Sequence, residues 1–293
     1  MDLSVVIVNR NTRSFLIPCV DSVLSAQGDL SVEVIVVDEH SADGSAQAVS
    51  DRFPEVLVVD DPSDCGYGHA NNLGLRLTAG RYVMTLNADT LVPSNALARL
   101  VAWMDAHPTV GVVGPKLVLA GGALDLACRR SFPTPANALY RYAGLARLFP
   151  NNPRFAGYNL TFLDDDREHE VDSVSGACML VRREAALQTG FFDEDYFLYG
   201  EDLDWAFRIK KAGWSVWYRP EVVVTHFKGQ ATRQRSARMI VEFHRAMLIF
   251  YRKHYASRHP WFLNAAVAAG VVMRGMFVLA RNSLRPPERK RVA

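Results

Sequence analysis

The first ninety residues alternate between short apolar runs and segments with helical spacing, and this alternation limits the possible folds more than any other feature. The apolar runs are rich in β-branched residues and cover residues 3–9, 32–38, 56–60 and 81–87. The segments with helical spacing lie between them, at residues 13–26, 44–52 and 69–79. Runs that are almost continuously apolar are typical of parallel strands buried under helices on both faces. The pattern therefore predicts an α/β protein with an open, doubly wound, mainly parallel sheet.

The chain beyond residue 90 is less regular and ends in helices. We expect a helix at 94–106 and a strand at 110–118, followed by loops and short helices at 120–170. A strand at 171–183 and a helix from Gly200 should follow, and then a strand pair over WSVWY and EVVVTH. The last expected elements are helices at 233–256 and 261–283. We therefore predict one α/β domain over residues 1–230 and a basic helical extension over residues 231–293.

Charge is distributed unevenly along the chain, although the net charge is only +2. From Lys228 onward, 14 Lys and Arg residues accompany only two acids, Glu242 and Glu288; the rest of the chain has 19 bases and 29 acids. A basic tail on an acidic body indicates an anionic partner, either membrane lipid or nucleic acid. No nucleic-acid recognition motif accompanies the charge, so we expect lipid and no nucleic acid.

The expected helix at 261–283 is nearly apolar enough to cross a membrane, but Asn264 and Arg274 interrupt it. We predict instead an interfacial helix that contacts anionic lipid together with Arg281, Arg285, Arg289, Lys290 and Arg291. Packing of this helix on the rest of the chain, or on a second subunit in a homo-oligomer, remains an alternative.

Two further features concern the compartment. The four cysteines, Cys19, Cys65, Cys128 and Cys178, form no CxxC pair, which predicts reduced thiols in the cytoplasm. A strand pattern begins after two residues, with no basic segment or cleavage site before it, so we expect no secretory signal.

Polar residues follow each of the first four apolar runs, at 9–11, 38–41, 60–61 and 87–89. Ligands of open α/β sheets bind beyond the carboxyl ends of the strands, so these residues are candidates for a binding site. Asp38 would accept hydrogen bonds from a nucleotide base or ribose, while Asp43 would cap the next helix. Asp89 would either cap a helix or bind a metal ion; Mg²⁺ often takes only one or two protein carboxylates.

The segment CGYGHANNLGL, residues 65–75, follows a strand and opens a helix. It lacks the third glycine and the first-strand position of a dinucleotide fingerprint, so a Rossmann cofactor site is not expected. Its glycines and amides suit phosphate or ribose contact at a helix N-terminus, or simply close packing of the helix on the sheet.

The segment GEDLDWAFR, residues 200–208, places three acids at a predicted helix start, where the helix dipole alone favours them. Asp204 and Arg208 stand four apart and would form a surface ion pair. Glu201 and Asp202 have no such partner, and a carboxylate among aromatic residues suits a general base. The rings of Tyr199 and Trp205 suit a sugar acceptor.

His226 ends the last predicted strand, in THFKGQ. A lone histidine is usually structural, but this one is expected at the same sheet edge as Asp89. Histidine is a good ligand for cations of the manganese class, so Asp89 and His226 are the candidate metal ligands.

These motifs occur in a fixed order: VVIVNRN, VVDEHSADGS, CGYGHANNLGL, LNADT, SGACMLVRR, FFDEDYFLYGEDLDWAFRIKKAGW and then His226. The ordered set, over residues 3–230, resembles the family 2 glycosyltransferases of the GT-A fold, particularly rhamnosyltransferase-like members. The resemblance implies a nucleotide-sugar-binding half at 1–118 and an acceptor and catalytic half at 119–230.

The resemblance also implies roles for individual residues. Asp202 matches the family's catalytic base, with Glu201 beside it. Asp89 matches the second aspartate of its DxD metal motif, with Asn87 in place of the first, and His226 matches a histidine that completes the metal site. Contacts to the nucleotide sugar are expected from Val8, Asn9, Asn11, Asp38, Gly66, Tyr67, Asn72, Asn87, Ala88, Asp89 and Gly176.

The expected activity is that of a metal-dependent, inverting glycosyltransferase. It would use Mn²⁺ or Mg²⁺ and move a sugar such as rhamnose from a dTDP- or UDP-sugar to a glycan or polyprenyl-linked acceptor. Such an enzyme would make cell-surface polysaccharide at the inner face of the plasma membrane. Two alternatives remain: a sugar-phosphate nucleotidyltransferase, although NRNTRSF lacks the glycines of its loop, and a non-catalytic, membrane-associated relative.

Overall fold

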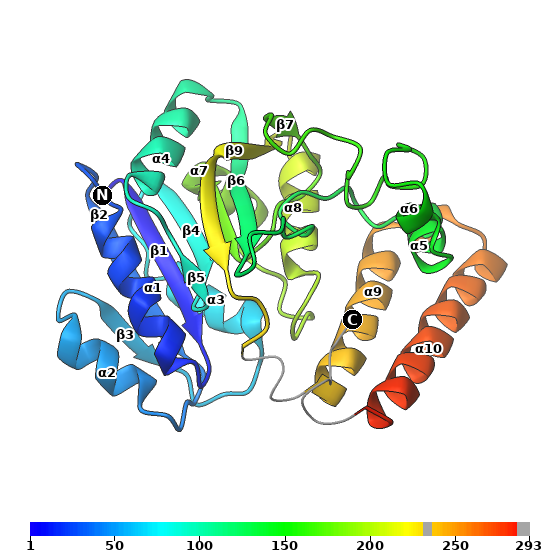
Figure 1. Ribbon diagram of the computed structural model, residues 1–293, viewed down its shortest axis with the longest axis horizontal. Coiled ribbons are helices and arrows are strands. Elements are labelled where there is room, and N and C mark those ends of the chain that lie inside the picture. The colour runs from blue at the N-terminus through cyan, green and yellow to red at the C-terminus, as the bar shows by residue number, and fades with distance from the viewer. Residues whose placement is uncertain (231–235, 286–293) are drawn as a thin grey trace.

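The N-terminal half of the protein is a parallel sheet covered by helices, as the alternation predicts. The computed structural model describes residues 1–230 and 236–285. Its first four long strands are β1 (Leu3–Asn9), β2 (Val32–Asp38), β3 (Leu57–Asp60) and β4 (Tyr82–Asn87), and they lie in the order β3-β2-β1-β4, all parallel. The connections carry α1 (Arg13–Ser25), α2 (Ser45–Arg52) and α3 (Tyr67–Leu75) (Figure 1). The fold class is confirmed.

The sheet continues beyond β4 with mixed strand directions. β8 (Cys178–Arg182) pairs antiparallel with β4, β6 (Val110–Leu119) antiparallel with β8, and β9 (Ser215–His226) parallel with β6. The short strands β5 (Thr90–Leu91) and β7 (His169–Glu170) both pair with β9, and the described residues form a nine-stranded sheet. The helices of this half are α4 (Ala96–Ala106), α7 (Arg183–Thr189) and α8 (Glu201–Lys211).

One prediction for this half is wrong. WSVWY and EVVVTH are not a strand pair but parts of the single strand β9. Its register against β6 shifts where Pro115 pairs with Arg219 and Lys116 pairs with Val223. Pro220 stands at this irregularity and has no N–H for the ladder, so the sequence there resembles a strand end although the chain continues in the same direction.

The core explains why these segments became strands. All seven residues of β1 are buried, and Val5, Val6 and Ile7 are completely so. Helix α3 packs tightly over this strand: a Cβ added to Gly74 would lie 2.5 Å from Val6 Cγ1. The glycine therefore permits close packing of helix on sheet, which was the alternative to ligand contact for this residue.

The segment between β6 and β7 forms loops and short helices at the side of the sheet, as predicted. Helix α5 (Pro135–Tyr142) is capped by Thr134, whose side chain accepts a hydrogen bond from the Asn137 N–H, and the helix contains no buried residue. Helix α6 (Leu145–Leu148) follows directly. This segment lies beside the C-terminal helices α9 and α10 (Figure 1).

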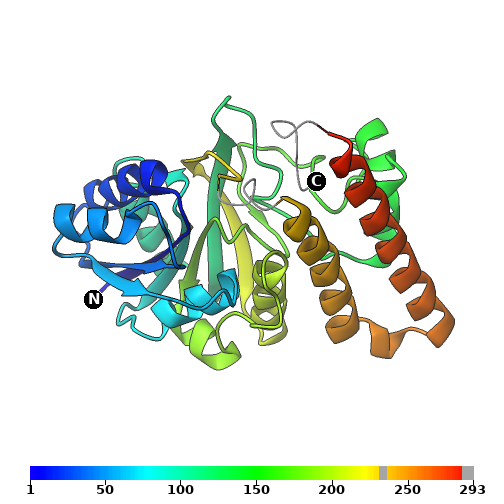
Figure 2. The same ribbon diagram turned by 90° about the horizontal axis from the view of Figure 1, so that it is seen from below.

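Two antiparallel helices close the described chain, α9 (Ser236–His254) and α10 (Trp261–Ser283), linked by the short turn η2 (Ala256–Arg258). α9 packs on α8 through an apolar cluster of Tyr196, Leu203, Ala246 and Phe250. α10 packs on α9 and lies outermost (Figure 2). The predicted start of α9 at residue 233 and the basic residues Arg289, Lys290 and Arg291 lie outside the described residues.

Helix α10 has its polar and apolar faces reversed relative to a helix of a soluble domain. Asn264 bonds inward to the Tyr251 hydroxyl (2.7 Å), and Asn282 is buried and donates to Ser236 Oγ. The Arg274 guanidinium lies 3.8 Å from the centre of the Tyr142 ring of α5. Trp261, Phe262, Met273, Met276 and Phe277 are instead at least 59% exposed. By length and composition, α10 could cross a membrane, and 6% of its most apolar window is buried.

Candidate active site

The polar residues that follow the parallel strands meet at one edge of the sheet. Asn9 pairs with Asp38, Asp38 with Asp60, and Val8 with Asn87 in the strand register. The carboxyl ends of β1, β2, β3 and β4 therefore lie side by side, as the sequence predicts. His226, at the end of β9, pairs with Thr90 of β5 and so lies next to Asp89.

Asp38 is fixed within this edge rather than open to solvent. Its Oδ1 accepts from Asn9 Nδ2 at 2.6 Å, and its Oδ2 accepts from the Ser41 N–H at 3.0 Å. Asn9 is completely buried, and its Oδ1 accepts from Thr12 Oγ1. Both ends of the Asn9 amide are thus used to hold Asp38 and Thr12, and the contact of Asn9 with the nucleotide sugar stays a prediction.

Asp89 and His226 face each other, and neither is a helix cap. The distance from His226 Nε2 to Asp89 Oδ1 is 3.3 Å. The other ring nitrogen, Nδ1, lies 3.0 Å from Asp125 Oδ2, and Lys228 Nζ lies 2.6 Å from Asp125 Oδ1. A carboxylate behind a histidine fixes the ring orientation and the tautomer that the other nitrogen presents. This arrangement directs Nε2 towards Asp89.

Charge explains the shifted pKa values of His226, Asp89 and Asp125. Burial lowers the pKa of His226, but hydrogen bonds to Asp125 and Asp89 and their charges outweigh burial and raise it to about 9. Burial likewise works against ionisation of Asp89 and Asp125, yet bonds to His226 lower the pKa of both, with Lys228 contributing at Asp125. In the absence of another cation, the His226 imidazolium and the Lys228 ammonium together therefore neutralise the two carboxylates.

A chain of close polar contacts connects this pair to Asp202. Asn87 Nδ2 lies 3.4 Å from His226 Nε2, and Asn87 Oδ1 accepts from the Tyr67 hydroxyl at 2.8 Å. The same hydroxyl lies 3.1 Å from the Gly176 carbonyl oxygen, and the Gly176 N–H donates to Asp202 Oδ2 at 2.9 Å. Residues that are distant in sequence thus form one network with Asp89 and His226 on one side and Asp202 on the other.

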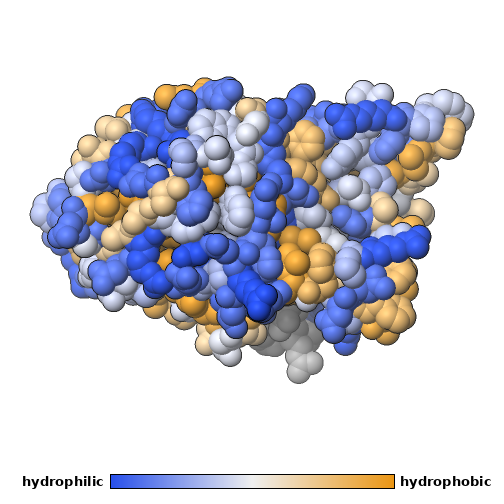
Figure 3. Space-filling model, turned by 90° about the horizontal axis from the view of Figure 1, so that it is seen from above, coloured by the Kyte–Doolittle hydropathy of each residue, from blue (hydrophilic) through white to orange (hydrophobic). Residues whose placement is uncertain are grey.

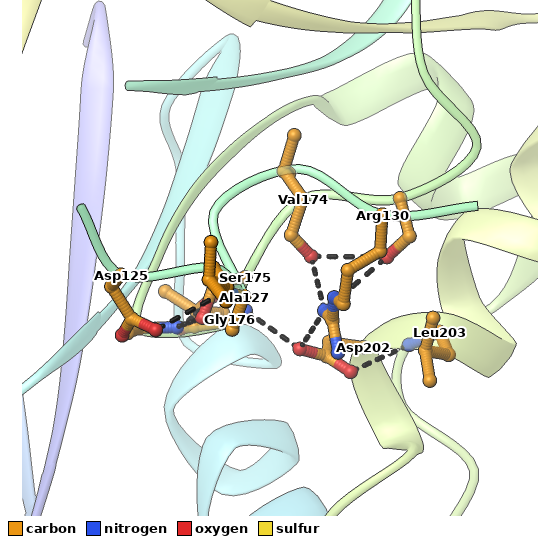
Figure 4. Close-up of polar contacts among 12 residues, drawn as sticks. Asp125, Ala127, Arg130, Val174, Ser175, Gly176, Asp202 and Leu203 are labelled. Atoms are coloured by element: carbon orange, nitrogen blue, oxygen red, sulfur yellow. Dashed lines mark hydrogen bonds and ion pairs between the residues drawn. The ribbon is translucent and has the colours of Figure 1, made fainter. Parts of the chain in front are cut away.

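Asp202 stands at the start of α8 and is paired with a cation, Arg130, that is 72 residues away in sequence. Arg130 Nη2 lies 2.6 Å from Asp202 Oδ2 and 2.7 Å from the Val174 carbonyl oxygen (Figure 4). Burial disfavours the Arg130 charge, but the attraction of Asp202 outweighs burial and raises the pKa of the guanidinium. Asp202 Oδ1 accepts from the Leu203 N–H at 2.7 Å. The expectation that Asp202 has no partner is therefore wrong.

Glu201 differs sharply from Asp202. It is 5% exposed, and its Oε2 makes no hydrogen bond to the described residues. Burial, followed by the Asp202 charge, raises the pKa of Glu201 to about 8. A carboxyl group that is mostly protonated near neutral pH is a poor proton acceptor, so the geometry favours Asp202 as the base.

Several predicted contacts lie away from this network. Trp205 is completely buried against Phe192, with ring centres 4.6 Å apart, so its predicted contact with an acceptor is not possible in this structure. Asn72 is 3% exposed, and its amide bonds to the main chain of Phe192 and to Glu194. Asp204 does pair with Arg208 at 2.6 Å, but the carboxylate is buried and also bonds His254, so this is no surface pair.

The remaining predicted residues border the network. Val8 and Ala88 are buried beside the strand ends, and Asn11 Oδ1 accepts from the Ala42 N–H. Gly66 has φ +102°, and a Cβ there would collide with the Phe197 main chain, so glycine is needed to let α3 approach that loop. Tyr199 has φ +70°, a rare conformation for a residue with a side chain, and its ring packs edge-on against Phe243.

The comparison with known proteins agrees with this geometry. The profile described as glycosyl transferase family 2 matches residues 4–189, and that of glycosyl transferase family group 2 matches residues 154–284. The chain therefore belongs to glycosyl transferase family 2. It is 30% identical, over 92% of its own length and 90% of the relative's, to the N-acetylglucosaminyl-diphospho-decaprenol L-rhamnosyltransferase of Mycobacterium tuberculosis.

Solved structures share the fold. A mannosyltransferase from Pyrobaculum calidifontis, in complex with GDP-Man and Mn²⁺, is 20% identical and superposes with a TM-score of 0.58 over 95% of this chain and 72% of its own. TarS of S. aureus, in complex with UDP-GlcNAc, is 15% identical, with a TM-score of 0.59 over 97% and 75%. The predicted family, the GT-A fold and the glycosyltransferase class are confirmed. Membership of this family rules out the alternatives of a sugar-phosphate nucleotidyltransferase and of a non-catalytic relative.

Proposed function

We propose that this glycosyltransferase moves a sugar, rhamnose in our preferred assignment, from a dTDP- or UDP-sugar to a lipid-linked acceptor, with inversion at the anomeric carbon. The observation that carries the proposal is the chain of close polar contacts that joins Asp89 and His226 to Asp202 across Asn87, Tyr67 and Gly176. The Mycobacterium tuberculosis relative, whose name specifies a rhamnosyl transfer to a decaprenol-linked acceptor, supports the choice of sugar and acceptor.

Asp202 is the proposed base. A sugar hydroxyl becomes a good nucleophile only as its proton is removed. Arg130 and Gly176 both bind Oδ2, which orients the carboxylate and leaves a lone pair of Oδ1 beside its one bond to Leu203. Oδ1 is therefore the proton acceptor in this proposal. The attacking oxygen would then approach from the face opposite the leaving diphosphate, which gives inversion.

Asp89 and His226 are the proposed ligands of a divalent cation, Mn²⁺ or Mg²⁺. Their donor atoms face each other, and Asp125 fixes the far side of the imidazole, so one carboxylate and one imidazole nitrogen are aimed at the same point. This donor set fits cations that complete their coordination with phosphate oxygens and water. When bound, the cation would neutralise charge on the departing diphosphate. Asp38, at the end of β2 and two strands from β4, would contact the nucleoside.

The lipid-linked acceptor requires access to a membrane, and α10 supplies a suitable surface. Its outward residues are apolar, whereas Asn264, Arg274 and Asn282 face α9 or α5. Asn264 and Arg274, which interrupt the apolar pattern of this helix, therefore do not lie on its outer face. Basic residues flank the helix at Arg258, Arg281 and Arg285. We propose that α10 lies at the interface of an anionic membrane, at the cytoplasmic face.

The test of the proposed reaction is Asp202→Asn. We expect transfer, measured with dTDP-rhamnose and an N-acetylglucosaminyl diphosphate lipid, to fall by about 10²-fold or more, since general base catalysis contributes about 10²–10⁴-fold. Binding of the nucleotide sugar, measured by thermal shift, should stay close to wild type. Asp195→Asn changes an exposed carboxylate nearby and should leave both unchanged. Wild-type turnover by Asp202→Asn would remove Asp202 from the role.

A further inference from the structure

A largely apolar cavity lies beside the active site, between α5, the start of α8 and α9. Its walls include Pro133, Ala138, Tyr142, Leu203, Phe243 and Met247. Among these, Leu203 touches the network of Asp89, His226 and Asp202, through the hydrogen bond from its N–H to Asp202 Oδ1. In Figure 3, apolar surface gathers at the end of the molecule formed by α5, α6 and the two C-terminal helices.

The cavity adjoins the start of α8, which carries the proposed base. Gly200 and Leu203, on either side of the Glu201–Asp202 pair, both line it. Tyr199 also lines it and holds its positive φ of 70° with its ring against Phe243 of α9. Strained main chain of this kind persists where the surroundings fix it and is common at ligand sites. A molecule in the cavity would therefore lie against the start of α8, the element that carries Asp202.

Cations accompany the apolar walls. Arg141 of α5 lines the cavity, and its guanidinium lies 5.0 Å from the centre of the Tyr158 ring. Arg274 of α10 lies 3.8 Å from the ring of Tyr142, another wall residue. Arg130 lies further in and binds Asp202. Apolar walls with guanidinium groups around them match an amphiphile that has a hydrocarbon chain and a phosphate head group.

We propose that this cavity binds the part of the acceptor's lipid carrier nearest its diphosphate: the first isoprene units lie against α5 and α9, and Arg141 binds the phosphates. This inference rests on the proposed function, because it assigns the lipid subsite of the same transfer. The same assignment gives α10 a role in the entry of the lipid substrate. The apolar outer face of α10 would bring the cavity to the bilayer from which the lipid enters.

Two matched variants of α5 test the assignment. Ala138→Trp fills the cavity, whereas Ala136→Trp adds the same side chain at an exposed position of the same helix. Because α5 contains no buried residue, neither change disturbs the core. The probe is farnesyl diphosphate, a short isoprenoid diphosphate, and its binding is measured by isothermal titration calorimetry. We expect binding to wild type and to Ala136→Trp, and at least tenfold weaker binding to Ala138→Trp.

Three results would overturn the assignment: equal affinity of farnesyl diphosphate for Ala138→Trp, no binding to the wild type, or competition by inorganic diphosphate as strong as by the isoprenoid. If Ala138→Trp instead weakens the binding of methyl N-acetylglucosaminide and leaves the binding of farnesyl diphosphate unchanged, the cavity binds the acceptor sugar and not the lipid.

The change in melting temperature caused by nucleotide sugars, measured on the same variants, separates this failure from failure of the proposed function. If nucleotide sugars raise the melting temperature of the variants as they do for wild type, and Ala138→Trp binds farnesyl diphosphate as wild type does, only the lipid subsite is rejected. If nucleotide sugars do not raise the melting temperature at all, the glycosyl donor itself is rejected.

Discussion

At the scale of single residues, the pairing of Asp202 with Arg130 is the feature with the clearest energetic consequence. Both residues are 8% exposed, and removal of one partner from a buried ion pair leaves an uncompensated charge. We expect Arg130→Met to lower the free energy of unfolding by about 3–5 kcal/mol. The double variant Arg130→Met/Asp202→Asn should be more stable than Arg130→Met alone. Urea denaturation of the four proteins measures this coupling, and additive losses would show that the pair is not coupled.

Glu201 predicts a pH dependence of stability. Its pKa is about 8 in the folded protein against 4.5 for the ordinary side chain. The folded state therefore holds the proton more tightly, and the stability that this provides is present below about pH 4.5 and is lost as the pH rises towards 8. Glu201→Gln removes this loss. The melting temperature of the variant should exceed that of wild type by more at pH 8 than at pH 5; equal differences would contradict the assigned shift.

The sequence predicted Asp89, Asp202 and His226 because each stands at a strand or helix end with a recognisable neighbourhood. Asp125 and Arg130 were missed because they lie in the irregular segment that follows β6, where no periodicity assigns an orientation. Only one signal could have found Asp125: like Asp89, it comes shortly after a buried strand. Arg130 has no such signal, since its distance from Asp202 depends on how the loop folds back over Ser173 and Val174.

At the scale of elements, α10 offers the sharpest test of membrane contact. Met273 and Phe277 are 60% and 66% exposed on its outer face. Transfer of such side chains into an apolar phase contributes about 1.5–3 kcal/mol each, so Met273→Asp/Phe277→Asp should weaken binding to anionic vesicles more than tenfold. Leu187→Asp, at a 61% exposed position of α7, is the matched control. Undiminished sedimentation of the double variant with vesicles would show that another surface binds them.

The elements themselves show where sequence reasoning succeeds. The strands β1, β2 and β4 and the helix α10 follow the predicted ranges closely, because apolar periodicity and burial agree there. β9 was divided in two because Pro220 interrupts its pattern. The inward orientation of Asn264 and Arg274 could not be predicted, because it depends on partners, Tyr251 and Tyr142, that are remote in sequence.

At the scale of the whole molecule, the acidic α/β domain and the basic helical extension form one working arrangement. The described part of the extension covers α8 through α9 and is joined to it by His254, whose Nε2 lies 2.7 Å from Asp204 Oδ1. The active-site edge, the apolar cavity and the outer face of α10 therefore succeed one another across the molecule. The division into domains at residue 230 remains a prediction, as does the oligomeric state.

The measurement that tests the central claim most directly is thermal unfolding of the wild type with dTDP- and UDP-sugars, each with and without Mn²⁺. It needs no acceptor, and it addresses the donor and the cation together. We predict a rise in melting temperature with one nucleotide sugar only when Mn²⁺ is present, retained in Asp202→Asn and lost in Asp89→Ala and His226→Ala. An equal rise in the presence of EDTA, or an undiminished rise in both ligand variants, would contradict the account.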